Sequence, residues 1–320
     1  MEYYKKINND KIQCLLCNHY CKLKKNQIGI CGVNQNINNE LKNLVYGYPI
    51  AINIDPIEKK PLYHFLPNSR ALSIGTIGCN FKCPFCQNWS ISHNHQKISL
   101  NSSLLTNGYK STIEGFDKDN YISPLKIIEI ALRTSVESIA YTYNEPTIFY
   151  PYLKNIAILA KENGLKNIMV SNGFMTKAVI KDMVGVIDAL NIDLKSFNSD
   201  YYKKNLSGDL NIILENLILI KELGFWVEIT TLIIPTKNDS ESELTKIASF
   251  IANKLGKEVP WHISAFHPDY KETNLPRTPL NTLKKAYDIG KKTGLKYIYI
   301  GNAGLAEQRN FNEDTEGVFE

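Results

Sequence analysis

The 320-residue chain lacks any run of about 18 apolar residues, and its opening stretch, MEYYKKINNDKIQ, lacks the apolar core of a signal peptide. These absences argue against a membrane span and against secretion. Long basic runs are missing as well, because the net charge is only +5 and lysines occur in short pairs such as Lys5–Lys6 and Lys59–Lys60. This mild, scattered charge does not indicate nucleic-acid binding.

Cysteine is absent after residue 86, although the chain contains seven cysteines. A secreted disulfide framework would use an even number and spread the pairs along the chain. Clustered cysteines in a cytosolic chain more often bind metal. We therefore expect a cytoplasmic, metal-binding protein. The seven residues are Cys14, Cys17, Cys21, Cys31, Cys79, Cys83 and Cys86.

From residue 71 onward, β-rich runs alternate with amphipathic helical patterns. Ser123 is a typical N-cap followed by Pro124 at the first helical position, and Gly164 is expected to close the next helix. The alternation predicts a parallel sheet of six β/α units with a possible seventh strand. The expected strands lie in 71–78, 138–146, 167–173, 189–196, 225–235, 261–268 and 296–302, and the expected helices in 123–135, 147–164, 176–185, 209–223, 240–255 and 279–293.

Polar residues follow several of these strands, at Asn144–Glu145, Ser171–Asn172, Asp193–Lys195 and His267. A barrel gathers such residues from many strands at its C-terminal rim, whereas a doubly wound sheet concentrates them at one switch point. The dispersed pattern favours an α/β fold built as a partial (β/α)6 TIM-like barrel.

The chain divides into three predicted parts: a small Cys-rich N-terminal module (1–70), the barrel (71–302) and an acidic tail (303–320) that we expect to be disordered. Residues 93–122 are polar and are expected to form a rim loop. The stretch DPIEKKPLYHF before the first barrel strand is either a segment across the barrel mouth or a solvated linker.

Cys79, Cys83 and Cys86 follow directly on the first predicted barrel strand. Thiolates suit zinc or iron–sulfur clusters, and three of them leave one position of a [4Fe–4S] cluster open to an outside ligand. Gly78 would let the chain turn, and Phe85 would shield the cluster from solvent. The alternative is a zinc site that borrows His93 or His95 as its fourth ligand.

This CxxxCxxC loop, with an aromatic residue before its last cysteine, resembles the radical S-adenosylmethionine (SAM) superfamily. The resemblance covers residues 71 to about 302 and implies a partial barrel with a [4Fe–4S] cluster, whose open iron SAM chelates through its amino and carboxylate groups. Reductive cleavage of SAM would then make a 5′-deoxyadenosyl radical that abstracts hydrogen from a substrate.

The resemblance also implies SAM contacts at the ends of the strands. Glu145 matches the glutamate of a Gly-Gly-Glu motif that holds the SAM ammonium, with Tyr143 and Asn144 in place of the glycines. Asp193 and Lys195 match a ribose-contacting Asp-Leu-Lys. The other implied contacts are Phe85, Asn144, Ser171, Asn172 and His267, the last near ribose or adenine.

Simpler explanations exist for each of these residues taken alone. Glu145 would be a surface carboxylate, and Asp193 and Lys195 would be a rim ion pair. His262 and His267 would be structural histidines. The set as a whole, placed at the ends of successive strands, favours the SAM site.

The spacing of Cys14, Cys17, Cys21 and Cys31 would close a tetrahedral site around zinc or hold an auxiliary [4Fe–4S] cluster. Both metals prefer thiolates, so the two assignments stay open here. Reduced free thiols are the simplest alternative, and His19 is a possible substitute ligand.

The Cys-rich start, the segments NLVYGYPIAINIDPIEKKPLYHFLP and SNGFMT, and WHISAFHPDYK resemble the radical SAM member of the AmmeMemoRadiSam system, which is related to pyruvate formate-lyase activating enzymes. This implies a flavodoxin- or ferredoxin-like electron donor and AMMECR1-like and Memo-like partners. A glycyl radical enzyme activase is the alternative, and a non-catalytic zinc-binding protein is the alternative of another class. The Cys-x-x-Cys pair that usually ends this family is missing after residue 302.

Overall fold

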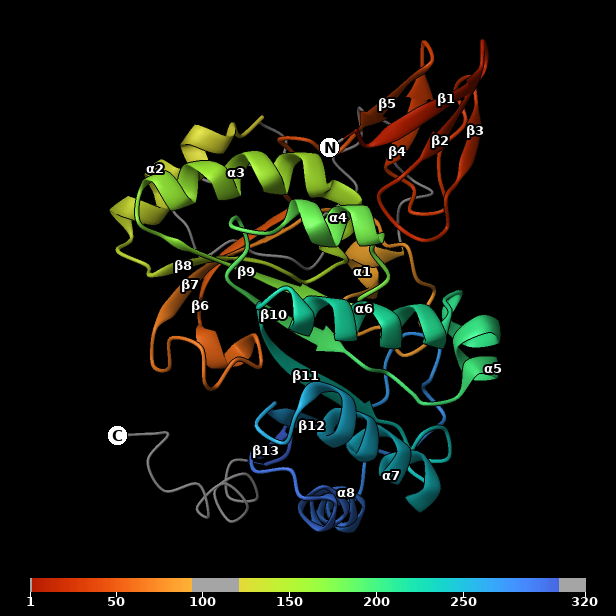
Figure 1. Cartoon of the computed structure of the whole chain (residues 1–320), viewed down its shortest axis with the longest axis vertical. Coiled ribbons are helices and arrows are strands. Elements are labelled where there is room, and N and C mark those ends of the chain that lie inside the picture. Colours follow the sequence, from red (N-terminus) through yellow and green to blue (C-terminus); the bar gives the residue numbers. More distant parts are fainter. Residues whose placement is uncertain (1, 94–120, 305–320) are drawn as a thin grey trace.

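The computed structural model describes residues 2–93 and 121–304 of the chain. Its centre is an eight-stranded sheet in the order β13-β12-β11-β10-β9-β8-β7-β6, in which all neighbours are parallel except the edge strand β6 (Figure 1). The strands follow one another in chain order without a switch point, and β6 and β13 are the two edges, so the predicted partial barrel is confirmed. The possible seventh parallel strand is present. The strands are β6 (Ala51–Pro56), β7 (Arg70–Gly75), β8 (Ser138–Tyr141), β9 (Lys166–Ser171), β10 (Ala189–Asp193), β11 (Trp226–Ile233), β12 (Trp261–Ala265) and β13 (Ile298–Gly301).

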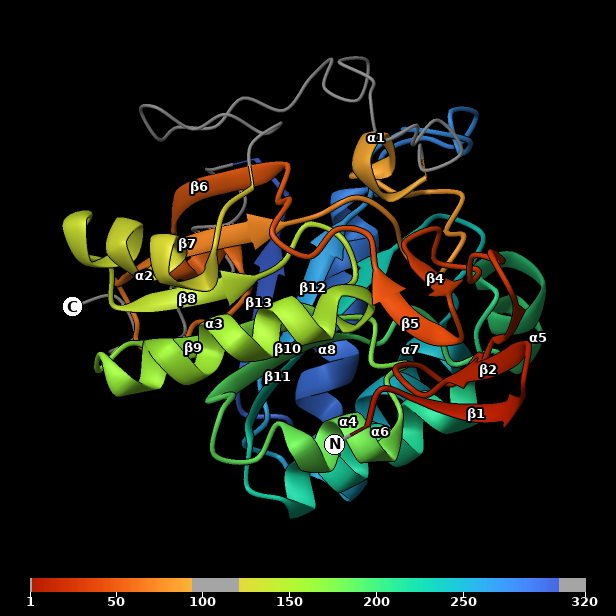
Figure 2. The ribbon, with the colours of Figure 1, turned by 90° about the horizontal axis from the view of Figure 1, so that it is seen from above.

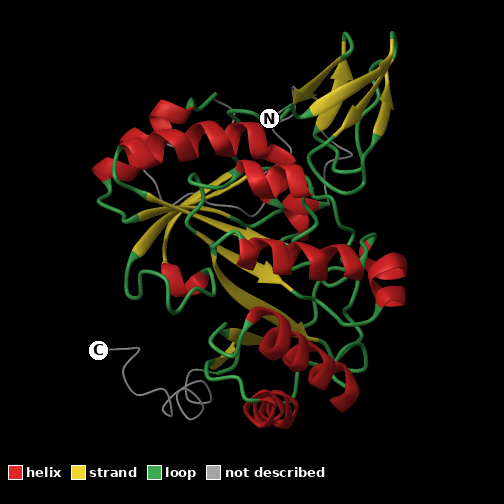
Figure 3. Ribbon diagram, viewed as in Figure 1, coloured by secondary structure: helices red, strands yellow, loops and turns green. Residues whose placement is uncertain are grey.

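Helices cover the sheet along one face (Figure 3). Ser123 accepts a hydrogen bond from the Lys126 N–H and Pro124 begins α2, as the sequence predicts, while Gly164 has a positive φ just after α3. In residues 2–93 and 121–304, no helix has the length and hydrophobicity of a transmembrane span. The α-helices are α1 (Trp89–Ser92), α2 (Pro124–Arg133), α3 (Tyr150–Glu162), α4 (Lys177–Asp182), α5 (Ser199–Tyr201), α6 (Leu210–Glu222), α7 (Glu241–Phe250) and α8 (Leu280–Thr293), and the short 3₁₀ or π turns are η1 (Ile57–Lys59), η3 (Pro146–Phe149), η4 (Tyr202–Leu206) and η5 (Ile251–Leu255).

The N-terminal residues form two small antiparallel sheets beside the rim of the large one (Figure 2). The domain boundary at residue 70 stays a prediction, and β6 joins the large sheet upstream of it. The predicted rim loop falls almost entirely, and the predicted acidic tail in all but its first two residues, outside the described residues. The small sheets are β1 (Tyr4–Asn8), β2 (Lys11–Cys14) and β3 (Lys22–Lys24), and then β4 (Asn34–Ile37) and β5 (Glu40–Asn43).

Residues 57–66 pack against the N-terminal end of the large sheet. Ile57 and Leu62 are buried there in a cluster with one residue from each of four strands, Ala71, Ala140, Ile168 and Ala189. The backbone N–H groups of Tyr63 and His64 each donate to the buried Glu228 carboxylate at 3.0 Å. His262 Nε2 lies 2.6 Å from the same carboxylate. The expectation that this segment crosses the barrel mouth is therefore wrong, because Glu228 and His262 belong to the first halves of β11 and β12. His262 is a structural histidine, as the simpler explanation held.

Candidate functional site

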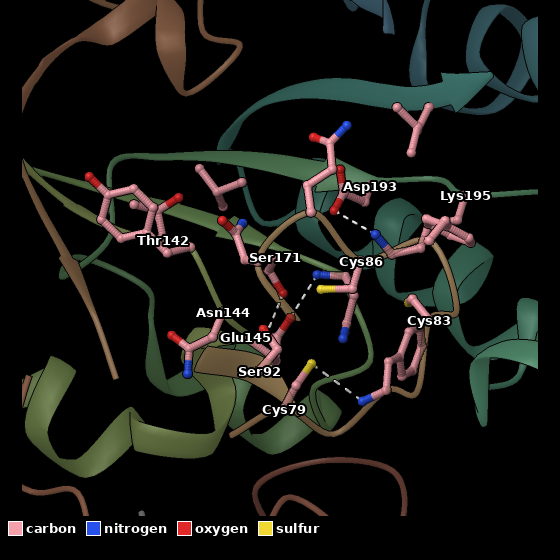
Figure 4. A pocket seen from close by; sticks show the side chains of 18 of the residues that line it. Cys79, Cys83, Cys86, Ser92, Thr142, Asn144, Glu145, Ser171, Asp193 and Lys195 are labelled. Atoms are coloured by element: carbon pink, nitrogen blue, oxygen red, sulfur yellow. Dashed lines mark hydrogen bonds and ion pairs between the residues drawn. The ribbon is translucent and has the colours of Figure 1, made fainter. Parts of the chain in front are cut away.

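The three-cysteine loop leaves β7 at the C-terminal rim and lines a cavity of about 230 Å³ (Figure 4). Cys83 is buried, and Cys79 and Cys86 are partly buried. Phe85 is also buried and lines the cavity beside them. The loop thus brings three sulfur atoms and one aromatic shield to a single hollow.

Two features hold the start of this loop. Gly78 has a φ of +94°, and a Cβ atom there would lie 2.4 Å from the carbonyl oxygen of Cys31, so only glycine fits. The Asn144 side-chain amide donates to the Gly78 carbonyl at 2.9 Å and to Thr76 Oγ1 at 3.1 Å. Asn144 lines the cavity, but its side chain anchors the loop, and its predicted SAM contact stays a prediction.

The thiols sit in an environment that disfavours their charged form. Burial raises the pKa of Cys83 to about 12, although Lys195 opposes this, and burial also raises the pKa of Cys79 and Cys86. A thiolate here needs a compensating cation, and metal coordination supplies one. Three soft ligands in one cavity fit an iron–sulfur cluster with one open position.

Glu145, which directly precedes η3, is buried at the cavity wall. Its Oε1 atom accepts hydrogen bonds from Ser171 Oγ at 2.8 Å and from the Thr147 hydroxyl at 2.5 Å, and its Oε2 atom accepts one from the Asn172 N–H at 2.8 Å. Burial raises the pKa of Glu145 even against these donors. The carboxylate is therefore fixed in orientation and would be stabilised by a cationic ligand.

The end of β9 joins this carboxylate to the cysteine loop. Asn172 donates from its side chain to Asn80 Oδ1 at 2.7 Å, so it contacts the residue that follows Cys79. Ser171 and Asn172 both line the cavity, and their predicted contact with SAM stays a prediction. The two predicted pairs at the ends of β8 and β9 thus form one hydrogen-bonded wall.

The end of β10 supplies the opposite wall with an ion pair. Lys195 Nζ lies 2.8 Å from Asp193 Oδ2 and 5.9 Å from the centre of the Phe85 ring. Burial alone would lower the pKa of Lys195, but Asp193 raises it above its ordinary value. Lys195 therefore stays charged near Cys83, and Figure 4 shows the two members of the pair pointing toward each other at the cavity.

His267 is exposed and is not among the residues that line the cavity, so its predicted SAM contact stays a prediction. Its loop approaches the cysteine loop through later residues. Asp269 Oδ1 accepts from Trp89 Nε1 at 3.0 Å, and the Tyr270 ring stacks on Trp89 and on His93 at 5.5 and 5.2 Å. His93, the alternative zinc ligand, packs on the Tyr270 ring and also lines the cavity, so that alternative stays open, while His95 lies outside the described residues.

Several lining residues were not predicted from the sequence. Thr230, Leu232 and Ser264 point inward from β11 and β12, and strand alternation carries the signal for them. Residues in the loop after Cys86 carry no such periodic signal. The unpredicted lining residues are Phe81, Gln87, Asn88, Ser92, Thr142, Tyr143, Val170, Thr230, Leu232 and Ser264.

The N-terminal cysteines line a second, smaller cavity. Cys14, Cys17 and Cys31 are buried there and Cys21 is partly buried, and burial raises the pKa of Cys14 to about 12. No group of three His, Cys, Asp or Glu side chains within residues 2–93 and 121–304 has the spacing of a single-ion site. The fit to a metal rests here on four soft donors that face one hollow.

The two cysteine clusters are neighbours in space. His19, from the loop between Cys17 and Cys21, places Nε2 2.8 Å from the Asn80 carbonyl oxygen. The side chain of Asn18 donates to the carbonyl oxygens of Phe174 and Met175, just after β9. The N-terminal module is thus fastened to the rim that carries the first cavity.

Known proteins match this chain along most of its length. A family model described as the radical SAM superfamily matches residues 73–251. An uncharacterized protein of Methanocaldococcus jannaschii is 39% identical over 312 residues, which cover 96% of this chain and 86% of that protein. The benzylsuccinate synthase activating enzyme of Thauera aromatica is 20% identical over 292 residues, with 73% of this chain and 88% of that protein covered.

A radical SAM methyltransferase from Sphaerobacter thermophilus shares the fold with a TM-score of 0.53 at 14% identity, over 76% of this chain and 69% of that one. The family match over residues 73–251 contains the three-cysteine loop and the ends of β8, β9 and β10. The superfamily implies a [4Fe–4S] cluster and SAM, which agree with the donors found here. The chain is an enzyme of the radical SAM superfamily.

Proposed function

We propose that Cys79, Cys83 and Cys86 hold a [4Fe–4S] cluster and that SAM binds beside it. The observation that supports this most directly is the shared cavity, in which three thiols face a buried carboxylate and a lysine–aspartate pair. When bound, the cluster and SAM would supply one-electron reductive cleavage of the sulfonium and a 5′-deoxyadenosyl radical for hydrogen abstraction from a substrate.

The residues of this chain bind and orient. Glu145 carries a fixed negative charge for the SAM ammonium, because Ser171 and the Asn172 N–H hold its two oxygens. Asp193 and Lys195 offer an acceptor and a donor to the ribose hydroxyls. Phe85 keeps water from the sulfur atoms.

Two substrate classes remain as proposals. The relative named as the benzylsuccinate synthase activating enzyme supports a glycyl radical enzyme as the substrate. The resemblance to the AmmeMemoRadiSam system instead supports another target, modified together with AMMECR1-like and Memo-like partners. We favour the second, since its characteristic segments run through both the N-terminal module and the barrel. The clustered cysteines favour a cytoplasmic location.

The N-terminal cavity is proposed as a second metal site, holding zinc or an auxiliary iron–sulfur cluster on Cys14, Cys17, Cys21 and Cys31. Changing Cys21 to alanine should remove the second metal and leave the iron of the first site in place. Zinc and iron content, measured by mass spectrometry on the purified protein, separates the two metals. Equal metal content in the variant and the wild type would overturn this assignment.

The test of the main proposal is anaerobic reconstitution with iron, sulfide, SAM and dithionite. We expect a brown protein that absorbs near 400 nm and releases 5′-deoxyadenosine, because thiolate-bound iron absorbs there. Cys83→Ala should lose the nucleoside product and the part of the absorbance that belongs to the first cluster, whereas Cys21→Ala keeps the nucleoside product. A colourless wild-type protein that releases none would instead support the non-catalytic zinc-binding alternative.

A further inference from the structure

One face of the β1–β3 sheet is covered by lysines that lie apart in the sequence. The register pairs Lys5 with Gln13 and Gln13 with Lys22, and it sets Lys11 directly opposite Lys24. Directly paired residues share a face, as do residues two apart on one strand. Lys5, Lys11, Lys22 and Lys24 therefore form one surface, called the lysine face below.

Positive charge predominates on the lysine face: the hollow that Lys11 and Lys24 line also contains Lys25 and one acidic residue, Asp10. Lys5, Lys22 and Lys24 are exposed, and none of the four takes part in an ion pair with a carboxylate of residues 2–93 or 121–304. Like charges directly opposite each other on a sheet are destabilising, so Lys11 and Lys24 favour an anionic partner. Residues 1–50 hold seven lysines and three acidic residues, which is +4 of the net charge of +5.

The opposite, buried face of the same small sheet lies on the side of the N-terminal cysteines. Ile12 and Leu23 pair on that side and are buried, and Cys14 lies two residues from Ile12. Cys21 directly precedes β3. A protein docked on the lysine face is thus one sheet thickness from the N-terminal sulfur atoms. His19, between Cys17 and Cys21, in turn contacts Asn80 of the three-cysteine loop. Figure 2 shows β1 and β2 at the edge of the molecule.

We propose that the lysine face docks an acidic electron-transfer protein that carries a reduced flavin or iron–sulfur centre. This rests on the proposed function, which requires one electron for each SAM cleaved. The donor loses that electron and the cluster site gains it, and no proton or group is transferred at the surface. The face carries neither arginine nor an aromatic ring, the groups on which nucleic-acid surfaces depend, so a redox protein fits it better than RNA.

The test uses the reconstituted full chain with Lys11→Glu/Lys24→Glu. Two like charges remain opposite each other, so folding changes little while the surface charge is reversed. Lys246→Glu/Lys254→Glu, on exposed positions of α7 and η5, is the matched control with the same charge change. Reduced flavodoxin serves as the acidic donor, dithionite as the small donor, and a single-stranded RNA of about 20 nucleotides as the competing polyanion.

The lysine-face variant should bind flavodoxin about tenfold more weakly and show a KM for it raised by a similar factor, with an unchanged dithionite-driven rate. The control should match the wild type, and added salt should weaken wild-type binding. Equal flavodoxin affinity in both variants would overturn the proposal, as would RNA that binds the face more tightly than flavodoxin. If dithionite also yields no 5′-deoxyadenosine, the proposed function fails, while the flavodoxin affinities still decide the docking surface.

Discussion

The imidazole Nε2 of His19 lies 2.8 Å from the backbone carbonyl oxygen of Asn80, and this contact joins the two cysteine-bearing loops. The Asn80 side chain in turn accepts a hydrogen bond from Asn172, whose backbone N–H donates to Glu145. A short series of hydrogen bonds therefore connects the N-terminal module to the cavity wall.

His19→Ala should remove the first of these contacts. We expect a loss of about 1 kcal/mol in the free energy of unfolding and a changed EPR signal of the reduced cluster, because one hydrogen bond that holds the cysteine loop is gone. His19→Gln retains a donor and should recover most of the signal. An EPR signal in His19→Ala identical to that of the wild type would contradict this connection.

Glu145→Gln should weaken SAM binding about 10- to 100-fold, since a charge-assisted hydrogen bond is worth about 1.5–3 kcal/mol. Equilibrium dialysis with the reconstituted protein measures the affinity, and iron content shows that the cluster site is intact. Glu137→Gln, an exposed carboxylate that accepts the Arg70 N–H, is the control and should bind SAM normally. Equal losses in both variants would argue against a specific role for Glu145.

Gly78→Ala should destabilise the protein by about 2 to 4 kcal/mol, because it combines a positive φ with a clash against the Cys31 carbonyl. Gly185→Ala has a similar φ of +77° but no atom within 4 Å, so it isolates the backbone cost of about 1 kcal/mol. Urea unfolding measures both. If the two variants lose the same stability, the contact between Gly78 and the N-terminal module contributes nothing.

Glu228→Gln should destabilise the protein most near neutral pH. Burial alone would raise the pKa of Glu228, but hydrogen bonds from His262, Trp226 and the Tyr63 N–H lower it. The folded protein thus binds fewer protons at this site than the unfolded chain, so the stabilisation is present above the ordinary carboxylate pKa and is lost as the pH falls through the folded one.

We expect the variant to lose about 3 kcal/mol of unfolding free energy at pH 7, and a smaller amount below about pH 4. Urea unfolding across this pH range measures the loss. Glu129→Gln, at an exposed ion pair with Lys126 on α2, is the control and should change stability little at any pH. If Glu228→Gln lost the same unfolding free energy at every pH, the loss would come from altered packing and not from the missing negative charge.

The periodic part of the fold could be predicted from the sequence, because a covered parallel sheet forces apolar runs to alternate with amphipathic helices. Ser123 and Gly164 mark helix ends through local chemistry alone. The strand-end residues Glu145, Ser171 and Asp193 met in one cavity as predicted, since the carboxyl ends of parallel strands meet at one edge of a sheet.

The parts that were missed depend on contacts that no periodic pattern in the sequence reveals. The sequence suggests that Lys60 is solvated, yet it is only 2% exposed. Its burial is tolerated because the Asp55 carboxylate lies 2.7 Å from its ammonium group. The position of His267 depends on a loop whose path no periodicity describes, and that loop approaches the cysteines through Asp269 and Tyr270 instead. Strand register, which brings Lys11 and Lys24 together, is also invisible in a linear scan for basic runs.

Residues 57–66 occupy the N-terminal end of the large sheet, and this has a consequence for turnover. In the described part of the chain, Tyr63 and His64 occupy the end of the sheet remote from the cysteines. As far as the described residues show, we therefore expect nucleoside and substrate to enter and leave the cavity at the rim. If both use that opening, the order in which they bind and leave affects the turnover rate.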